Sequence, residues 1–202
     1  MEFRTDRPLS TTRDVLFSPS RFFDELPPDG PLRAPVLYIV ICTTINTTLR
    51  WLLNLIIFLP PISYFASAES PEVRPIFIGL LALFVGLLVL LPIFSIGYFF
   101  VFALLQHGLL RLFAGRDQGG LSATLRVLSY ATGACKAVSW IPLVNLLIGL
   151  YFYYLASTGL RRVHETSTIR ALAAVLVVPV LWLGLVVFAV FLVSRLSQEG
   201  GA

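Results

Sequence analysis

The densest group of ionisable residues in the 202-residue chain lies in a short link between two apolar segments. The candidate partner- or lipid-binding residues are those of this link and one arginine upstream of it, namely Arg126, Arg161, Arg162, His164, Glu165 and Arg170. Basic residues beside a membrane span attract anionic lipid head groups, and an acidic segment of a partner would meet the same charge. The alternative is a solvated turn whose charge only sets the orientation of the chain.

A second set of polar residues interrupts the apolar segments themselves. Its members are Asn46, Arg50, Asn54, Tyr130, Lys136 and Asn145. Polar groups in hydrocarbon need partners, so we expect these side chains to face other helices or water. Arg50 could instead extend its guanidinium to the membrane surface. Such residues are also candidates for the lining of a polar pathway.

Motifs of catalysis and cofactor binding are missing from the sequence. It contains no GxxxxGK[ST], HExxH or GxSxG pattern. Cys42 and Cys135 lack a metal-binding spacing, and His107 is expected to be a solvated or capping residue at a helix end. We therefore expect no catalytic residue, no metal and no cofactor, and we predict that the protein is not an enzyme.

The composition sets the class of protein. Hydrophobic residues make up 57% of the chain and charged residues 13%, far from the roughly 25% charged of soluble domains. The mean hydropathy of +0.85 indicates an integral membrane protein. The net charge of +4 comes from scattered arginines without interleaved aromatics, so we expect membrane lipids as partners and no nucleic acid.

Apolar periodicity and length predict an all-α protein, a single bundle of five transmembrane helices. The expected segments are Pro35–Phe58, Ile76–Gln106, Leu121–Trp140, Ile141–Leu160 and Ile169–Val193. The second is too long for one upright span, since about 31 residues reach about 46 Å across a core of about 30 Å. The third is weakly apolar, and it either crosses or is re-entrant. The third and fourth must form a hairpin because their connection is so short.

The distribution of basic residues predicts the orientation. With the N-terminus in the cytoplasm and five crossings, eleven basic residues lie on the cytoplasmic side and three on the other, with Arg50 inside the first span. This bias follows the positive-inside rule and places the C-terminus outside. A re-entrant third segment would leave four crossings and reduce the asymmetry, so the count favours five. We expect a multi-pass protein of the cell membrane.

The N-terminal tail, residues 1–34, is polar and carries both charge signs. Within it, Ser18 to Leu26 has a capping serine, a proline at the first helical position and acids further on, which predicts a short helix. Its apolar edge suits a helix on the membrane surface, or one that packs on the bundle. The transmembrane domain is expected over residues 35–194, followed by a short tail, 195–202.

The order of three stretches resembles the Yip1 domain family. They are SPSRFFDELPPDGPLRAP before the first span, QHGLLRLFAGRDQGGLSATLRVLSYAT into the third, and IPLVNLLIGLYFYYLASTGLRRVHETSTIRA after it. The resemblance covers Ser18 to about Val178 and implies five spans with a cytoplasmic N-terminus. In eukaryotes the family acts in membrane traffic, binding small GTPases and related membrane proteins. The acidic tail used there is short here. The arginine-rich composition suggests a bacterial inner-membrane member.

Two functions fit these observations. The first is a non-enzymatic scaffold or membrane-organising protein that acts through protein or lipid contacts, as a homo-oligomer or with other membrane proteins. The second is a small-solute or ion transporter or channel, with a pathway lined by the first span and the hairpin of the third and fourth. The scaffold is favoured because the proposed spans contain no acidic residue of the kind that proton-coupled transport commonly uses.

Overall fold

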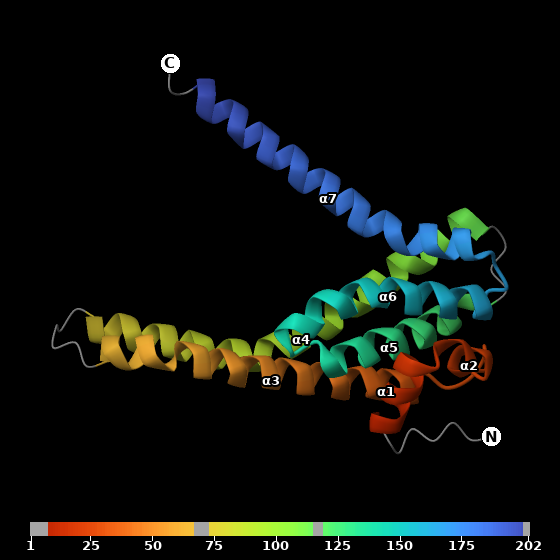
Figure 1. The fold of residues 1–202 in the computed structure, drawn as a ribbon, viewed down its shortest axis with the longest axis horizontal. Helices are drawn as coiled ribbons and strands as arrows, with labels where there is room; N and C mark the ends of the chain where they lie inside the picture. The colour runs from red at the N-terminus through yellow and green to blue at the C-terminus, as the bar shows by residue number, and fades with distance from the viewer. Residues whose placement is uncertain (1–7, 67–72, 115–118, 200–202) are drawn as a thin grey trace.

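A computed structural model of the chain describes residues 8–66, 73–114 and 119–199. Seven α-helices provide the regular structure of these residues, and no strand occurs among them. In Figure 1 the helices gather at one end of the molecule, from which long helical arms extend. The chain is an all-helical protein, as predicted.

Two short helices begin the described chain, α1 (Pro8–Phe17) and α2 (Pro19–Asp24). The predicted helix after Ser18 is confirmed, with Pro19 at its first position, where a missing N–H costs nothing. Phe22, Phe23 and Leu26 are buried in the core. Of the two roles expected for these apolar side chains, the structure therefore shows packing on the bundle.

The next two helices, α3 (Arg33–Ala66) and α4 (Val73–Ala114), run antiparallel and form one of the arms (Figure 1). The expected end of the first segment at Phe58 is wrong, because α3 continues through two prolines to Ala66. Prolines are tolerated in membrane helices, where neighbouring groups satisfy the freed carbonyls. The 42 residues of α4 reach about 63 Å and include Pro92, in agreement with the prediction that this segment exceeds one upright span.

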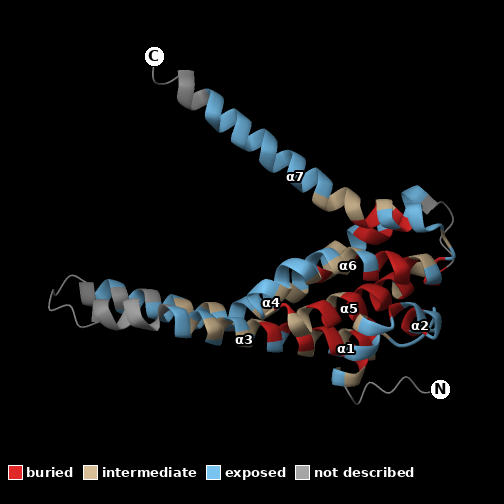
Figure 2. Cartoon of the chain, viewed as in Figure 1, coloured by how far each residue is buried: buried red, intermediate tan, exposed pale blue. Residues whose placement is uncertain are grey.

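A tight hairpin of α5 (Gly120–Val138) and α6 (Pro142–Val163) follows, and then α7 (Thr168–Glu199). The hairpin is confirmed. Helix α5 lies at the centre of the fold, packed on α1, α3, α4 and α6, while α2 packs on α6. Beyond its first turns α7 leaves the bundle, and Val180 to Arg195 are exposed (Figure 2).

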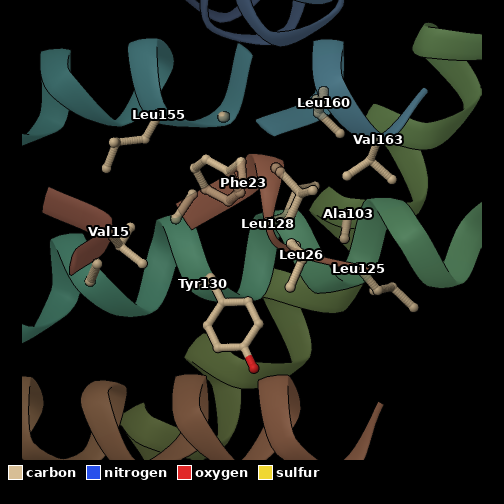
Figure 3. Close-up of a cluster of buried hydrophobic side chains, with 14 of the residues drawn as sticks. Val15, Phe23, Leu26, Ala103, Leu125, Leu128, Tyr130, Leu155, Leu160 and Val163 are labelled. Carbon is tan, nitrogen blue, oxygen red and sulfur yellow. The ribbon is translucent and has the colours of Figure 1, made fainter. Parts of the chain in front are cut away.

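Burial concentrates at the end of the molecule where α1 and α2 pack on α5 and α6, which we call the docked end (Figure 2). Figure 3 shows its core, in which Phe23 of α2 and Leu155 of α6 lie on one side of α5. Leu128 and Tyr130 of α5 are at most 1% exposed. The polar tail thus completes the hydrophobic core of the bundle.

Among the residues that the structure describes, four helices are long and apolar enough to cross a membrane. Their apolar stretches are Arg33–Ile57, Leu90–Phe113, Pro142–Val163 and Thr168–Arg195. Helix α5, the expected third span, is not among these four. The apolar helices make the chain a multi-pass membrane protein in contact with lipid.

Candidate functional site

A cavity of about 560 Å³ lies among α3, α4, α5 and α6. Helix α4 packs mainly on α3, α5 and α7, and α6 mainly on α2, α5 and α7, so the cavity separates α4 from α6. The two helices come together where the ring centroids of Phe102 and Phe152 lie 6.2 Å apart. This volume falls in the range of small-molecule sites, roughly 300–1,000 Å³.

The lining of the cavity divides into an apolar and a polar part. The apolar part includes Phe94, Tyr98 and Phe102 of α4 with Ile148 and Phe152 of α6. The polar part includes Arg50 of α3, Lys136 and Ser139 of α5, and Asn145 of α6. Among the described residues that line it, none carries a carboxylate. The cavity therefore has a positive potential that favours anions.

Asn46 fixes the end of α5 beside the cavity. Its side-chain nitrogen donates to the backbone oxygen of Lys136 and to the hydroxyl oxygen of Ser139, both at 2.8 Å. Asn46 is 3% exposed. One of these bonds satisfies a carbonyl in the last turn of α5, and both hold the turn that carries Lys136 against α3.

A smaller cavity of about 200 Å³ adjoins the first and shares Arg50, Ser139 and Asn145 with it. Asn54 lines only this smaller one. Five of the six polar residues singled out within the apolar segments, all except Tyr130, therefore lie in or beside the two cavities. Polarity within an apolar segment was the signal that found them.

Tyr130 lies elsewhere, in the core beneath the N-terminal helices. Its ring packs on Phe22 and Tyr38, with centroids 5.2 and 5.4 Å away. Tyr38 in turn shares a hydrogen bond of 2.7 Å with the hydroxyl of Thr12 in α1. Tyr130 thus belongs to the contacts that dock the tail on the bundle.

The arginines of the charged link contact α2 on one side and the start of α7 on the other. The Nε of Arg162 lies 2.8 Å from a carboxylate oxygen of Asp24 in α2, and both side chains are a little under half exposed. Arg161 donates to the hydroxyl of Thr168 at 3.1 Å. Glu165 and Arg170 are exposed. Four of the residues predicted to bind a partner or lipid therefore lie at a surface that carries both charge signs, namely Arg161, Arg162, Glu165 and Arg170.

Like His164, Arg126 belongs to that predicted group but is buried, at only 4% exposed. Its Nε and Nη1 atoms are buried without a hydrogen-bond partner. A Cβ added at Gly30, in the turn after α2, would lie 2.6 Å from Nη1. The absence of a side chain at this position lets the turn cover the guanidinium.

The two histidines meet in a buried cluster that sequence reasoning missed. The hydroxyl of Thr124 lies 2.9 Å from Nδ1 of His107 and 2.9 Å from Nε2 of His164. His107 is 9% exposed, so its expected role at a solvated helix end is wrong. The three residues come from α4, α5 and the link after α6. Because they lie on three separate elements, no local spacing could have revealed the cluster.

Within the described parts of the chain, no three side chains of histidine, cysteine, aspartate or glutamate come close enough to hold a metal ion. The chemistry available at the larger cavity is the binding of an anion or an amphiphile. The docked end exposes charges of both signs, including the pair of Arg162 with Asp24.

Comparison with known proteins gives one match. A family model of the Yip1 domain matches residues 13–191, which is most of the chain. The comparison with curated proteins found no significant match. The comparison with solved structures found none either.

Proposed function

Because the chain belongs to the Yip1 domain family, we propose that it is a non-enzymatic scaffold that organises the membrane through contacts at its docked end. The observation that carries this proposal is the surface formed by Asp24 and Arg162 together with Arg161, Glu165 and Arg170. A surface with both charge signs can pair with the same surface on a second copy.

The docking of the tail supports a role for this surface. Phe23 of α2 is 1% exposed against the bundle, and the hydroxyl of Tyr151 donates to the backbone oxygen of Leu16 at 2.7 Å. The N-terminal helices are therefore held by burial as well as by charge. Asp24 is presented on a fixed framework beside the link between α6 and α7, as a specific contact requires.

Five crossings with a cytoplasmic docked end is the topology that we propose. The 19 residues of α5 reach about 28 Å, close to the roughly 30 Å of the hydrocarbon core. Because α5 faces protein rather than lipid, its low hydropathy is compatible with crossing. The domain limits stay a prediction: a tail over 1–34, a transmembrane domain over 35–194 and a final tail over 195–202.

The distribution of charge favours this orientation. Figure 1 places α1, α2, the start of α5 and the end of α6 at one end of the molecule, with the C-terminus far from it. Arg13 of α1, Arg21 of α2 and the two arginines in the last turn of α6 lie at this same end. The positive-inside rule makes it the cytoplasmic end, in a protein of the cell membrane, with the C-terminus outside.

Energy transfer between donor- and acceptor-labelled copies in lipid vesicles tests the scaffold. We expect transfer that persists as the copies are diluted with lipid and that weakens at high salt, since exposed charge pairs are screened. The double variant Arg161→Ala with Arg162→Ala should reduce the transfer to the level of random encounters, with helix content unchanged.

A matched control carries the same change of net charge on α1 and α2. Arg13→Ala with Arg21→Ala removes two exposed arginines, which pair with Asp14 and with Glu25 respectively. This control should associate as the wild type does. The proposal would be contradicted if energy transfer between wild-type copies fell to the level of random encounters on dilution. It would also be contradicted if the two double variants showed equal energy transfer.

The cavity gives the second candidate function some support. Arg50, Lys136 and Asn145 converge there, as the pathway of a small-solute transporter or channel would require. This alternative predicts flux across vesicle membranes that Arg50→Ala abolishes. The filled core of the docked end, where Val15, Leu128 and Leu160 are 0% exposed, favours the scaffold because a pathway must open to both sides.

A further inference from the structure

The larger cavity has features that a contact scaffold does not explain. We propose that it binds one anionic amphiphile, a phospholipid whose phosphate lies between Arg50 and Lys136 and whose acyl chain lies along the aromatic wall between α4 and α6. This inference goes beyond the scaffold and does not depend on it.

The order of residues along each helix gives the cavity two chemically different parts. On α4, Phe94, Tyr98 and Phe102 recur every fourth residue, so they share one face. On α6, Asn145 lines the cavity near the hairpin turn, while Phe152 lies two turns further along and meets Phe102. A ligand that fits both parts is charged at one end and apolar along its length.

The polar part of the cavity lining indicates that the ligand carries a negative charge. Arg50 and Lys136 both line the cavity, and no described lining residue is acidic. A guanidinium presents a planar fork of donors that matches two phosphate oxygens, and an ammonium adds a compact point charge. Two cations close together in an apolar surrounding repel each other, and a bound phosphate relieves that repulsion.

A buried hydroxyl adds a further polar contact for the ligand. The oxygen of Thr132 is buried without a hydrogen-bond partner, and Thr132 lines the cavity one helical turn before Lys136. Buried polar groups in proteins are generally paired. An ester or glycerol oxygen next to the phosphate would supply the missing partner.

The position of the cavity lets a lipid enter from the bilayer. Phe94 and Tyr98 on its α4 side are 68% and 69% exposed. On α6, Leu146 and Leu147 are also largely exposed. Both helices contain candidate membrane spans, so the surfaces beside the gap face lipid. An acyl chain can enter between α4 and α6 without leaving the hydrocarbon.

Retention of lipid by the purified chain tests the proposal. The protein is reconstituted in mixed phosphatidylglycerol and phosphatidylcholine, extracted, and analysed by native mass spectrometry. We expect one retained phosphatidylglycerol per chain. Arg50→Gln and Lys136→Gln should each lower the affinity about tenfold, the usual scale for a lost charge-assisted bond. Arg195→Gln, which removes an exposed arginine of α7, is the charge control and should retain the lipid.

A second variant fills the cavity without changing its charge. Gly149 lines the cavity, and a Cβ added there would meet nothing within 4 Å. Gly149→Leu should therefore fold and exclude the lipid. Gly184→Leu introduces the same side chain on α7, where a Cβ also meets nothing within 4 Å, and it should leave retention unchanged.

Three results would overturn the proposal. The first is equal retention of phosphatidylcholine and phosphatidylglycerol. The second is full retention by a folded Gly149→Leu variant. The third is binding of free inorganic phosphate, added as a separate probe, by a chain that retains no lipid. Self-association is measured separately, so failure of lipid binding leaves the scaffold test intact, and the reverse also holds.

Discussion

At the scale of single residues, one hydroxyl joins the two histidines. Thr124 is 0% exposed and lies 2.9 Å from a ring nitrogen of His107 and of His164. Thr124→Val keeps the shape of the side chain but removes the hydrogen bonds to both rings. We expect a loss of about 1–3 kcal/mol for the two lost hydrogen bonds, seen as a lower unfolding temperature by circular dichroism in detergent.

The control for this change is Thr124→Ser, which keeps the hydroxyl and loses only a methyl group. We expect its unfolding temperature to lie close to that of the wild type. If the valine variant is as stable as the serine variant, the hydroxyl does not hold α4, α5 and the link together.

For Arg126 we expect that removing the polar group stabilises the protein, unlike the removal of the Thr124 hydroxyl. Its guanidinium is buried with Nε and Nη1 unpaired, and an unpaired buried charge is costly. Arg126→Met keeps the long stem and removes the charge, so we expect the unfolding temperature to rise. A fall would mean that the guanidinium has a stabilising partner. Arg195→Met, at an exposed position of α7, controls for the loss of one positive charge.

At the scale of helices, two glycines let α5 lie at the centre of the bundle. A Cβ added at Gly133 of α5 would lie 2.6 Å from the ring of Tyr38 in α3. One added at Gly159 of α6 would overlap Cγ1 of Val127 and lie 2.9 Å from the ring of Phe23. Small residues allow membrane helices to approach closely, and these two allow contact on two sides of α5.

Gly159→Ala tests this close packing. The added methyl group overlaps a branched side chain near its own backbone, which cannot move away freely. We expect a loss of about 1–3 kcal/mol, the usual cost of overpacking a core, measured as the free energy of unfolding in mixed detergent. Gly149→Ala, on the same helix beside open space, should change little. Equal stability of the two variants would contradict the packing of α5 on α6.

Much of the helical order was predictable because apolar length and proline positions are local signals. The hairpin of α5 and α6 and the helix after Ser18 followed from such signals. The central position of α5 did not follow. Its modest hydropathy suggested a weak span, whereas Tyr130, Leu128 and Ala131 are at most 1% exposed because other helices surround them. A hydropathy profile does not show whether a helix is surrounded by other helices or by lipid.

The candidate site was predictable to a similar degree. Arg50, Lys136 and Asn145 stood out as polar residues within apolar segments, and the structure brings them to one cavity. The burial of Arg126 could not be foreseen, because it depends on the turn at Gly30. The pairing of Arg162 with Asp24 depends on where the tail docks. These contacts join residues far apart in the chain, so sequence spacing carries no record of them.

At the scale of the whole molecule, the docked end and the cavity are separate regions. The docked end has a filled core and an exposed surface of both charge signs, whereas the cavity has one charge sign and lies between membrane helices. A protein with this division can assemble through one end while it holds a lipid elsewhere. Neither assembly nor lipid binding requires the protein to transport a solute.

Anion flux across vesicle membranes tests most directly whether the chain acts by contact or by transport. The positive lining of the cavity makes chloride and phosphate the solutes to measure. We expect vesicles that contain the chain to release both ions no faster than empty vesicles, at a protein density where energy transfer shows that the copies are assembled. Release that depends on the protein and is abolished by Arg50→Ala, with assembly unchanged, would contradict the scaffold and establish the transporter.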